Sequence, residues 1–74
     1  MESERPLDAL NAAKDKKVIV ELKNGRQLVG LLRSFDIHIN VVLDNTEEFE
    51  NGETKRKIGK AFVRGDTIIL ISPA

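Results

Sequence analysis

From residue 17 onward apolar residues recur in short segments and partly alternate with polar ones, and this pattern predicts β-strands. Short polar turns separate five such segments, the first of which, residues 17–22, is β-branched. The predicted strands are residues 17–22, 27–35, 38–48, 54–63 and 67–71. The pattern therefore indicates a mostly β protein.

Glycine positions indicate how these strands are connected. Asn24-Gly25 and Asn51-Gly52 are strong hairpin signals, because both central residues of that turn need positive φ. Gly30 lies inside the second strand, where a glycine often marks a bend or bulge. We expect an antiparallel sheet with a bend near Gly30.

The third predicted strand carries polar side chains on one face. Alternation places Ile39, Val41 and Leu43 toward the core. His38 and Asn40 then share the opposite face. This strand is the first candidate location for a functional site.

Only the beginning of the chain has helical spacing. Leu7, Leu10 and Ala13 form one narrow apolar stripe, and Pro6 suits a first helical position. The predicted helix, about residues 6–13, is too short to be stable alone and must pack on the sheet.

Five short antiparallel strands cannot pack as two full sheets, but they can curl into a small barrel. We expect one domain over residues 1–74, with a strongly bent, open antiparallel barrel over about residues 17–72. The apolar last strand would be an aggregation hazard as an exposed edge. Pairing with identical neighbours would cover it, and a repeated head-to-tail contact can close into a ring.

Composition excludes several classes of site. The 74 residues include no cysteine and one histidine, so we expect no disulfide, no metal and no cofactor. No phosphate loop or nucleophile motif is present, so we expect no enzyme. No apolar run approaches the length of about 18 residues that spans a membrane, and we predict a cytoplasmic protein. The formal net charge is zero, so RNA binding would need local clusters or base stacking.

Two segments carry the remaining chemistry: residues 35–40, which read FDIHIN, and residues 62–66, which read FVRGD. At this spacing they resemble the two motifs of the Sm and Sm-like (Lsm) RNA-binding family, most closely its archaeal type. The resemblance covers residues 5–73. It implies an Sm-like, SH3-like barrel in a ring of identical subunits, usually seven, with the fourth strand of one paired with the fifth of the next. It also implies binding of uridine-rich single-stranded RNA, as a scaffold or chaperone in RNA processing.

The chemistry of an RNA site can be assigned to residues within these motifs. A base held between the His38 ring and the Arg64 guanidinium would gain stacking and cation–π attraction. The Asn40 amide has a donor and an acceptor that match the O4 and N3–H edge of uracil.

Three further residues would support this contact. We expect Asp66 to orient the Asn40 amide by accepting a hydrogen bond from it. Asp36 is expected to brace the loop, and the Gly65 N–H is a further donor. Alternatively, Asn40 and Asp66 hydrogen-bond a turn, as such residues often do.

Other features have alternative interpretations. The basic run Lys55, Arg56 and Lys57 is either a solvated hairpin arm beside acidic residues or an auxiliary RNA surface. Phe35 and Phe62 are expected in the core. The competing functional hypothesis is a small barrel that serves as a protein-interaction or structural module without RNA binding.

Overall fold

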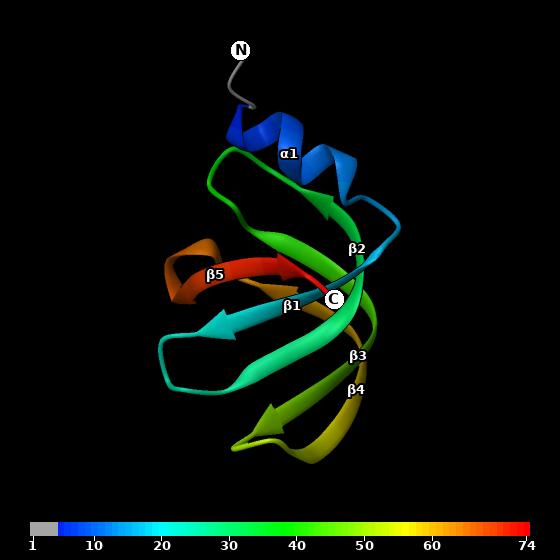
Figure 1. The fold of residues 1–74 in the computed structure, drawn as a ribbon, viewed down its shortest axis with the longest axis vertical. Coiled ribbons are helices and arrows are strands. Elements are labelled where there is room, and N and C mark those ends of the chain that lie inside the picture. The colour runs from blue at the N-terminus through cyan, green and yellow to red at the C-terminus, as the bar shows by residue number, and fades with distance from the viewer. Residues whose placement is uncertain (1–4) are drawn as a thin grey trace.

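The computed structural model describes residues 5–74, which form a short helix and a five-stranded antiparallel sheet (Figure 1). Helix α1 spans Pro6–Ala12, and a 3-10 turn, Gly65–Thr67, precedes the last strand. The strands are β1 (Lys17–Leu22), β2 (Gln27–Phe35), β3 (Val41–Glu50), β4 (Glu53–Val63) and β5 (Ile68–Pro73). Their order is β4-β3-β2-β1-β5, so β4 and β5 are the edges of an open sheet. The predicted fold class is confirmed.

The sheet is distorted where β2 carries Gly30. The register between β2 and β3 shifts from Val29 to Leu31. A Cβ atom at Gly30 would lie 2.9 Å from both the Asp44 carbonyl oxygen and Thr46 Oγ1. Only glycine lets the two backbones approach this closely, which agrees with the bend expected there.

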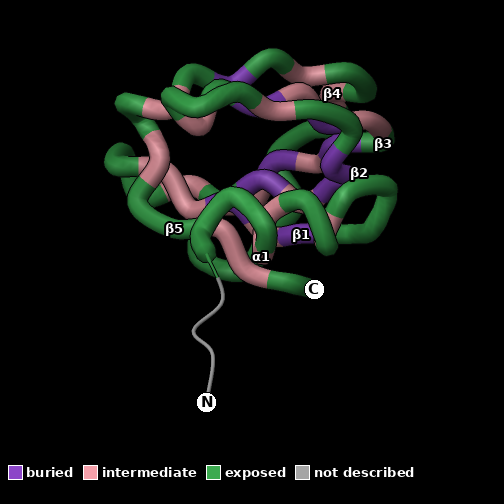
Figure 2. Tube along the Cα trace, turned by 90° about the horizontal axis from the view of Figure 1, so that it is seen from above, coloured by how far each residue is buried: buried purple, intermediate pink, exposed green. Residues whose placement is uncertain are grey.

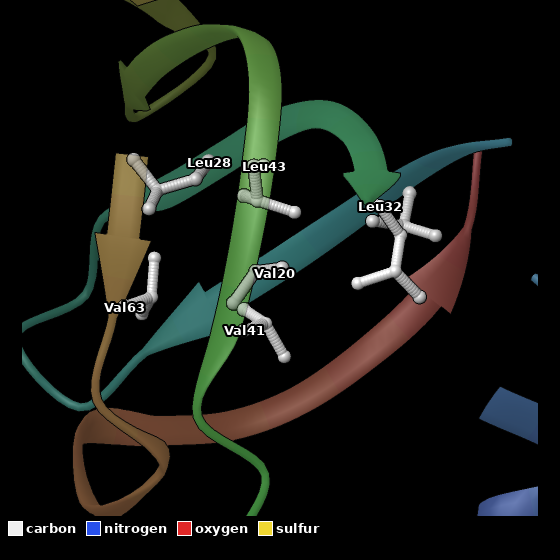
Figure 3. Close-up of a cluster of buried hydrophobic side chains, with 7 residues drawn as sticks. Val20, Leu28, Leu32, Val41, Leu43 and Val63 are labelled. Atoms are coloured by element: carbon white, nitrogen blue, oxygen red, sulfur yellow. The ribbon is translucent and has the colours of Figure 1, made fainter. Parts of the chain in front are cut away.

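The core lies on the inner face of the bent sheet (Figure 3). Its buried side chains come from β1 to β4 and are Val18, Val20, Leu28, Leu32, Val41, Leu43 and Val63. Seen from above, the buried segments lie along the strands while most of α1 is exposed (Figure 2). Leu10 and Ala13 nevertheless pack against the core, so the helix rests at one end of the barrel (Figure 1).

The two Asn-Gly turns differ. Asn51 and Gly52 both have positive φ, 53° and 80°, as predicted for a two-residue hairpin. In the β1–β2 turn only Gly25 has positive φ, 88°. The Asn24 side chain instead accepts a hydrogen bond from Arg26 N at 2.9 Å. The hairpin prediction was right for both turns, but the backbone predicted for Asn24 was wrong.

Phe62 was expected in the core and is 78% exposed. Its neighbour Val63 is buried on the inner face, and successive side chains of a strand point to opposite faces. Phe62 must therefore point outward. Phe35, by contrast, is partly buried and packs against the core as expected.

A nearly buried carboxylate lies inside the barrel between two arginines. The Glu48 side chain is 7% exposed. Its Oε1 accepts from Arg56 Nε at 2.7 Å, and its Oε2 accepts from Arg26 Nη1 at 3.1 Å. The hydrogen bond from Arg56, followed by that from Arg26, lowers the pKa of Glu48 below its usual value of 4.5. The ionised form is therefore the one that the fold stabilises.

Acidification is expected to remove the contribution of Glu48 to stability. Because its pKa is lower in the folded than in the unfolded chain, that contribution is complete above about pH 4.5 and is lost as pH falls through the folded pKa. Thermal unfolding from pH 7 to pH 3 should show the Tm difference between wild type and Glu48→Gln shrinking. Glu53 is exposed on β4, and Glu53→Gln serves as the control. If the Tm difference from wild type changes with pH by the same amount in Glu48→Gln and Glu53→Gln, the prediction is contradicted.

Candidate nucleic-acid interface

The connection between β2 and β3 is a compact turn built around Asp36. Asp36 Oδ1 accepts hydrogen bonds from the backbone N–H groups of His38 at 2.8 Å and Asn40 at 3.1 Å. The Asp36 N–H donates to the Asn40 carbonyl oxygen at 3.1 Å. These bonds hold the backbone in a turn, so the third strand begins at Val41. The prediction that it begins at residue 38 was wrong.

Ile39 explains why this turn resembles a strand in the sequence. Its side chain packs against the core, as an inward strand position would. Its backbone, however, has φ of 61°, which is rare for a β-branched residue. His38 and Asn40 are both exposed on either side of it. Their accessibility follows from the turn and not from strand alternation.

Gly65 brings the second motif against this turn. A Cβ atom at Gly65 would collide with the carbonyl oxygen of His38 and lie 2.8 Å from the carbonyl carbon of Ile39. The Gly65 N–H donates to Asn40 Oδ1 at 2.8 Å. The two motifs, far apart in the sequence, therefore meet. Together they line a surface hollow of about 550 Å³, formed by His38, Asn40, Arg64, Gly65 and Asp66.

The Asn40 amide is held in one orientation by two different partners. Its Nδ2 donates to Asp36 Oδ2 at 3.0 Å, while its Oδ1 accepts from Gly65 N. A flipped amide would place its NH₂ against the Gly65 N–H and its oxygen against the Asp36 carboxylate. Both contacts would be repulsive. Because an amide has two N–H groups and an oxygen that accepts twice, a second donor and a second acceptor remain for a ligand.

The residue that orients Asn40 is Asp36, and the assignment of this role to Asp66 was wrong. Asp66 Oδ2 accepts instead from Arg64 Nη2 at 3.1 Å. The 3-10 turn at Gly65–Thr67 keeps Asp66 beside Arg64 on its own segment. The Gly65 N–H is likewise used by Asn40, so it is not the additional ligand donor that was expected.

Asp36 is suited to this role because it stays ionised. The hydrogen bond from the Asn40 side chain lowers the pKa of Asp36, and the two backbone N–H groups lower it further. An ionised carboxylate only accepts hydrogen bonds, so it fixes which end of the amide faces it. An aspartate that bonds to backbone N–H groups following it is a recognised turn signal, and it could have indicated this arrangement.

His38 and Arg64 provide two flat groups at the same hollow, and both are exposed. Arg64 is held on one side by Asp66. A ring and a guanidinium plane are the groups on which unstacked bases pack in single-stranded RNA recognition. The hollow therefore combines two stacking surfaces with an oriented hydrogen-bonding edge.

The basic run on β4 is paired mainly with acidic side chains of its own hairpin. Arg56 contacts Glu48 at 2.7 Å, and Lys55 Nζ lies 4.0 Å from Glu50. These contacts favour the solvated hairpin arm over an auxiliary RNA surface.

Two observations concern other kinds of site. Among residues 5–74, no group of three or more His, Cys, Asp or Glu side chains is placed to hold a metal ion. No helix in the described part of the chain has the length and hydropathy needed to cross a membrane.

Comparison with known proteins gives consistent matches over nearly the whole chain. The sequence pattern of the LSM domain family matches residues 8–73. An Sm-like protein of Archaeoglobus fulgidus is 51% identical over 70 residues, which are 95% of this chain and 91% of that protein.

Two solved structures are similar in both fold and sequence. The Sm protein of Pyrococcus abyssii, solved in complex with a uridine heptamer, superposes with a TM-score of 0.93 at 45% identity, covering 96% of this chain and 100% of that one. The P. aerophilum SmAP1 heptamer superposes with a TM-score of 0.90 at 34% identity, covering 99% and 97%.

Proposed function

The chain belongs to the LSM domain family, and from this premise we propose that it binds uridine-rich single-stranded RNA as a ring of identical subunits. The observation that carries the proposal is the fixed amide of Asn40. Its free N–H can donate to uracil O4, and its free Oδ1 lone pair can accept from uracil N3–H. Cytosine presents a donor and an acceptor in the reverse order. Since Asp36 and Gly65 oppose the amide flip that would accommodate cytosine, uracil is the favoured base.

Stacking supplies most of the affinity at each site. A base placed between His38 and Arg64 would gain about 1–3 kcal/mol from stacking. Such contacts do not depend on which base is bound. We therefore assign affinity for the base to His38 and Arg64. We assign base preference to Asn40, as oriented by Asp36. Gly65 joins the two motifs, and Asp66 holds Arg64.

A ring would let one RNA occupy several of these sites. β4 and β5 are open edges, and edge-to-edge pairing of identical subunits would cover them. The P. aerophilum relative is a heptamer and the P. abyssii relative was solved with a uridine heptamer, which supports seven subunits and one uridine per subunit. Linked sites raise the overall affinity well above that of one site.

We further propose that residues 1–74 form one Sm-like domain, although residues 1–4 lie outside the described part of the chain. Its role would be that of a cytoplasmic scaffold or chaperone in RNA processing, without catalysis. RNA recovered intact after prolonged incubation with the protein would agree with this, and cleavage would contradict it.

The substitution Asp36→Asn tests the origin of the base preference. The new side chain would keep an oxygen for the backbone N–H groups but would present an NH₂ to Asn40, so the Asn40 amide would no longer have one preferred orientation. We expect the ratio of oligouridine to oligocytidine affinity to fall by about tenfold, the effect of one hydrogen bond to a charged group. Fluorescence anisotropy with both oligonucleotides at one salt concentration measures it.

Asp66→Asn is the matched control, because Asp66 contacts Arg64 and not Asn40. It should leave the base preference unchanged. If the ratio of oligouridine to oligocytidine affinity falls in Asp66→Asn but not in Asp36→Asn, Asp36 is not the residue that orients the Asn40 amide. If the wild-type protein binds all RNA weakly, without base preference and with strong salt dependence, the alternative of a protein-interaction or structural module is favoured.

A further inference from the structure

A second surface hollow lies between α1 and the ends of β1 and β5. Its volume is about 590 Å³, and it shares no residue with the hollow that contains His38, Asn40 and Arg64. Figure 2 shows α1 beside β5 and the C-terminus. We call this surface the α1 groove. Most of its wall is aliphatic and includes Ala9, Leu10, Ala13, Val18, Ile71 and Pro73.

The α1 groove is open because the helix covers the end of the barrel only in part. Leu10 and Ala13 pack against the core, but no residue of α1 is buried. The wall opposite the helix is fixed by backbone pairing, since Val18 lies opposite Pro73 in the β1–β5 ladder. The Ala74 N–H adds a hydrogen bond to the Lys17 carbonyl oxygen at 3.1 Å. A ligand would therefore meet a preformed apolar surface.

The charged groups at the α1 groove have one sign. Among the described residues, those that line it with a charge are Lys16 and Lys17, and both are exposed. Within residues 5–74 neither lysine forms an ion pair. Arg33 on β2, by contrast, contacts both Asp15 and Asp44. Two such cations beside an aliphatic wall complement a ligand that carries carboxylates next to aliphatic groups.

The wall of the α1 groove suits a peptide better than a nucleic acid. Bases of single-stranded RNA are held by aromatic rings or guanidinium planes. The described residues that line the groove include neither kind of group. Aliphatic side chains of a peptide would instead gain from burial against Leu10, Val18 and Ile71.

We propose that the α1 groove binds an acidic peptide segment of a partner protein. Its aliphatic side chains would lie against Leu10 and Ile71, and its carboxylates would pair with Lys16 and Lys17. The groove is formed within one chain, so the proposal depends on neither the ring nor uridine binding. Because the two hollows share no residue, one subunit would hold an RNA and a protein partner at the same time.

Synthetic peptides of defined charge test this proposal. The probe is a short fluorescein-labelled peptide of glutamate and leucine, measured by fluorescence anisotropy at physiological salt. Lys16→Glu/Lys17→Glu should lower its affinity at least about tenfold, because two attractive contacts become repulsive. A peptide with lysine in place of each glutamate should bind this double variant better than the wild type. Ala12→Glu places a carboxylate on the exposed helix side of the groove and should also weaken binding of the acidic peptide.

Lys14→Glu/Lys23→Glu is the matched control, because it makes the same change in net charge at exposed residues that do not line the α1 groove. Its affinity for the acidic peptide should stay within about threefold of the wild type, since charges outside the groove are screened by salt. Circular dichroism checks the fold of each variant. An equal loss in the two double variants, or no binding of the acidic peptide to the wild type, would overturn the proposal. Displacement of the peptide by oligouridine or oligoadenosine would also overturn it and identify the groove as an RNA surface.

Discussion

Alanine at His38 or at Arg64 is expected to reduce oligouridine affinity at least about 100-fold. Each substitution removes one of the two surfaces that hold the base, and base stacking contributes about 1–3 kcal/mol per base. For one site this free energy corresponds to an affinity loss of about 5- to 150-fold. In a ring every subunit loses the same contact, so an RNA that spans several sites loses it several times. Isothermal titration calorimetry with a seven-nucleotide oligouridine at fixed salt gives the affinity directly.

Lys57→Ala is the control for this experiment. Lys57 is an exposed cation on β4 and is not among the residues that line the hollow. It should change the affinity by less than about threefold at physiological salt, the change expected for one phosphate contact at most. A larger loss in Lys57→Ala than in Arg64→Ala would move the RNA surface to the basic hairpin arm.

The fold could be predicted from the sequence because local signals and the hydrophobic pattern agreed. Short apolar segments between turn signals identified the strands, and the Asn51-Gly52 turn formed as its residue types require. Gly30 marked the bend for a reason visible only in three dimensions, namely the approach of Thr46 and the Asp44 backbone. Asn24 shows the limit of such signals, because its side chain bonded to Arg26 N and the turn needed left-handed backbone only at Gly25.

The arrangement inside the site could not be predicted in the same way. Asp36 and Asp66 are equally able to accept from the Asn40 amide, and the choice depends on where two turns place them. The apolar side chain of Ile39 extended the apparent strand alternation, although its backbone is left-handed. Phe62 was misassigned because hydrophobicity alone favours burial, whereas its position next to Val63 fixes it on the outer face. Residue types thus identified residues that meet at one hollow, and tertiary contacts decided their hydrogen-bond partners.

Gly65→Ala is expected to disrupt stability and uridine binding together. The added methyl group would meet the carbonyl oxygen of His38 and the backbone of Ile39, neither of which can move as a flexible side chain can. Overpacking of this kind lowers the free energy of unfolding by about 1–3 kcal/mol. A clash with backbone atoms belongs at the upper end of that range. Relieving it would separate the Gly65 N–H from Asn40 Oδ1 and free the amide to flip. We therefore expect a lower Tm, weaker oligouridine binding and a reduced preference for uridine over cytidine.

Gly52→Ala separates this clash from the general effect of replacing a glycine. Gly52 has φ of 80° and nothing within 4 Å of its added Cβ atom, and it lies at the tip of the β3–β4 hairpin. Alanine there introduces backbone strain of about 1–2 kcal/mol without a collision. Its Tm should fall, but its oligouridine affinity and base preference should match the wild type. If Gly65→Ala also keeps the wild-type preference, the Gly65–Asn40 hydrogen bond does not orient the amide, and Asp36 alone must do so.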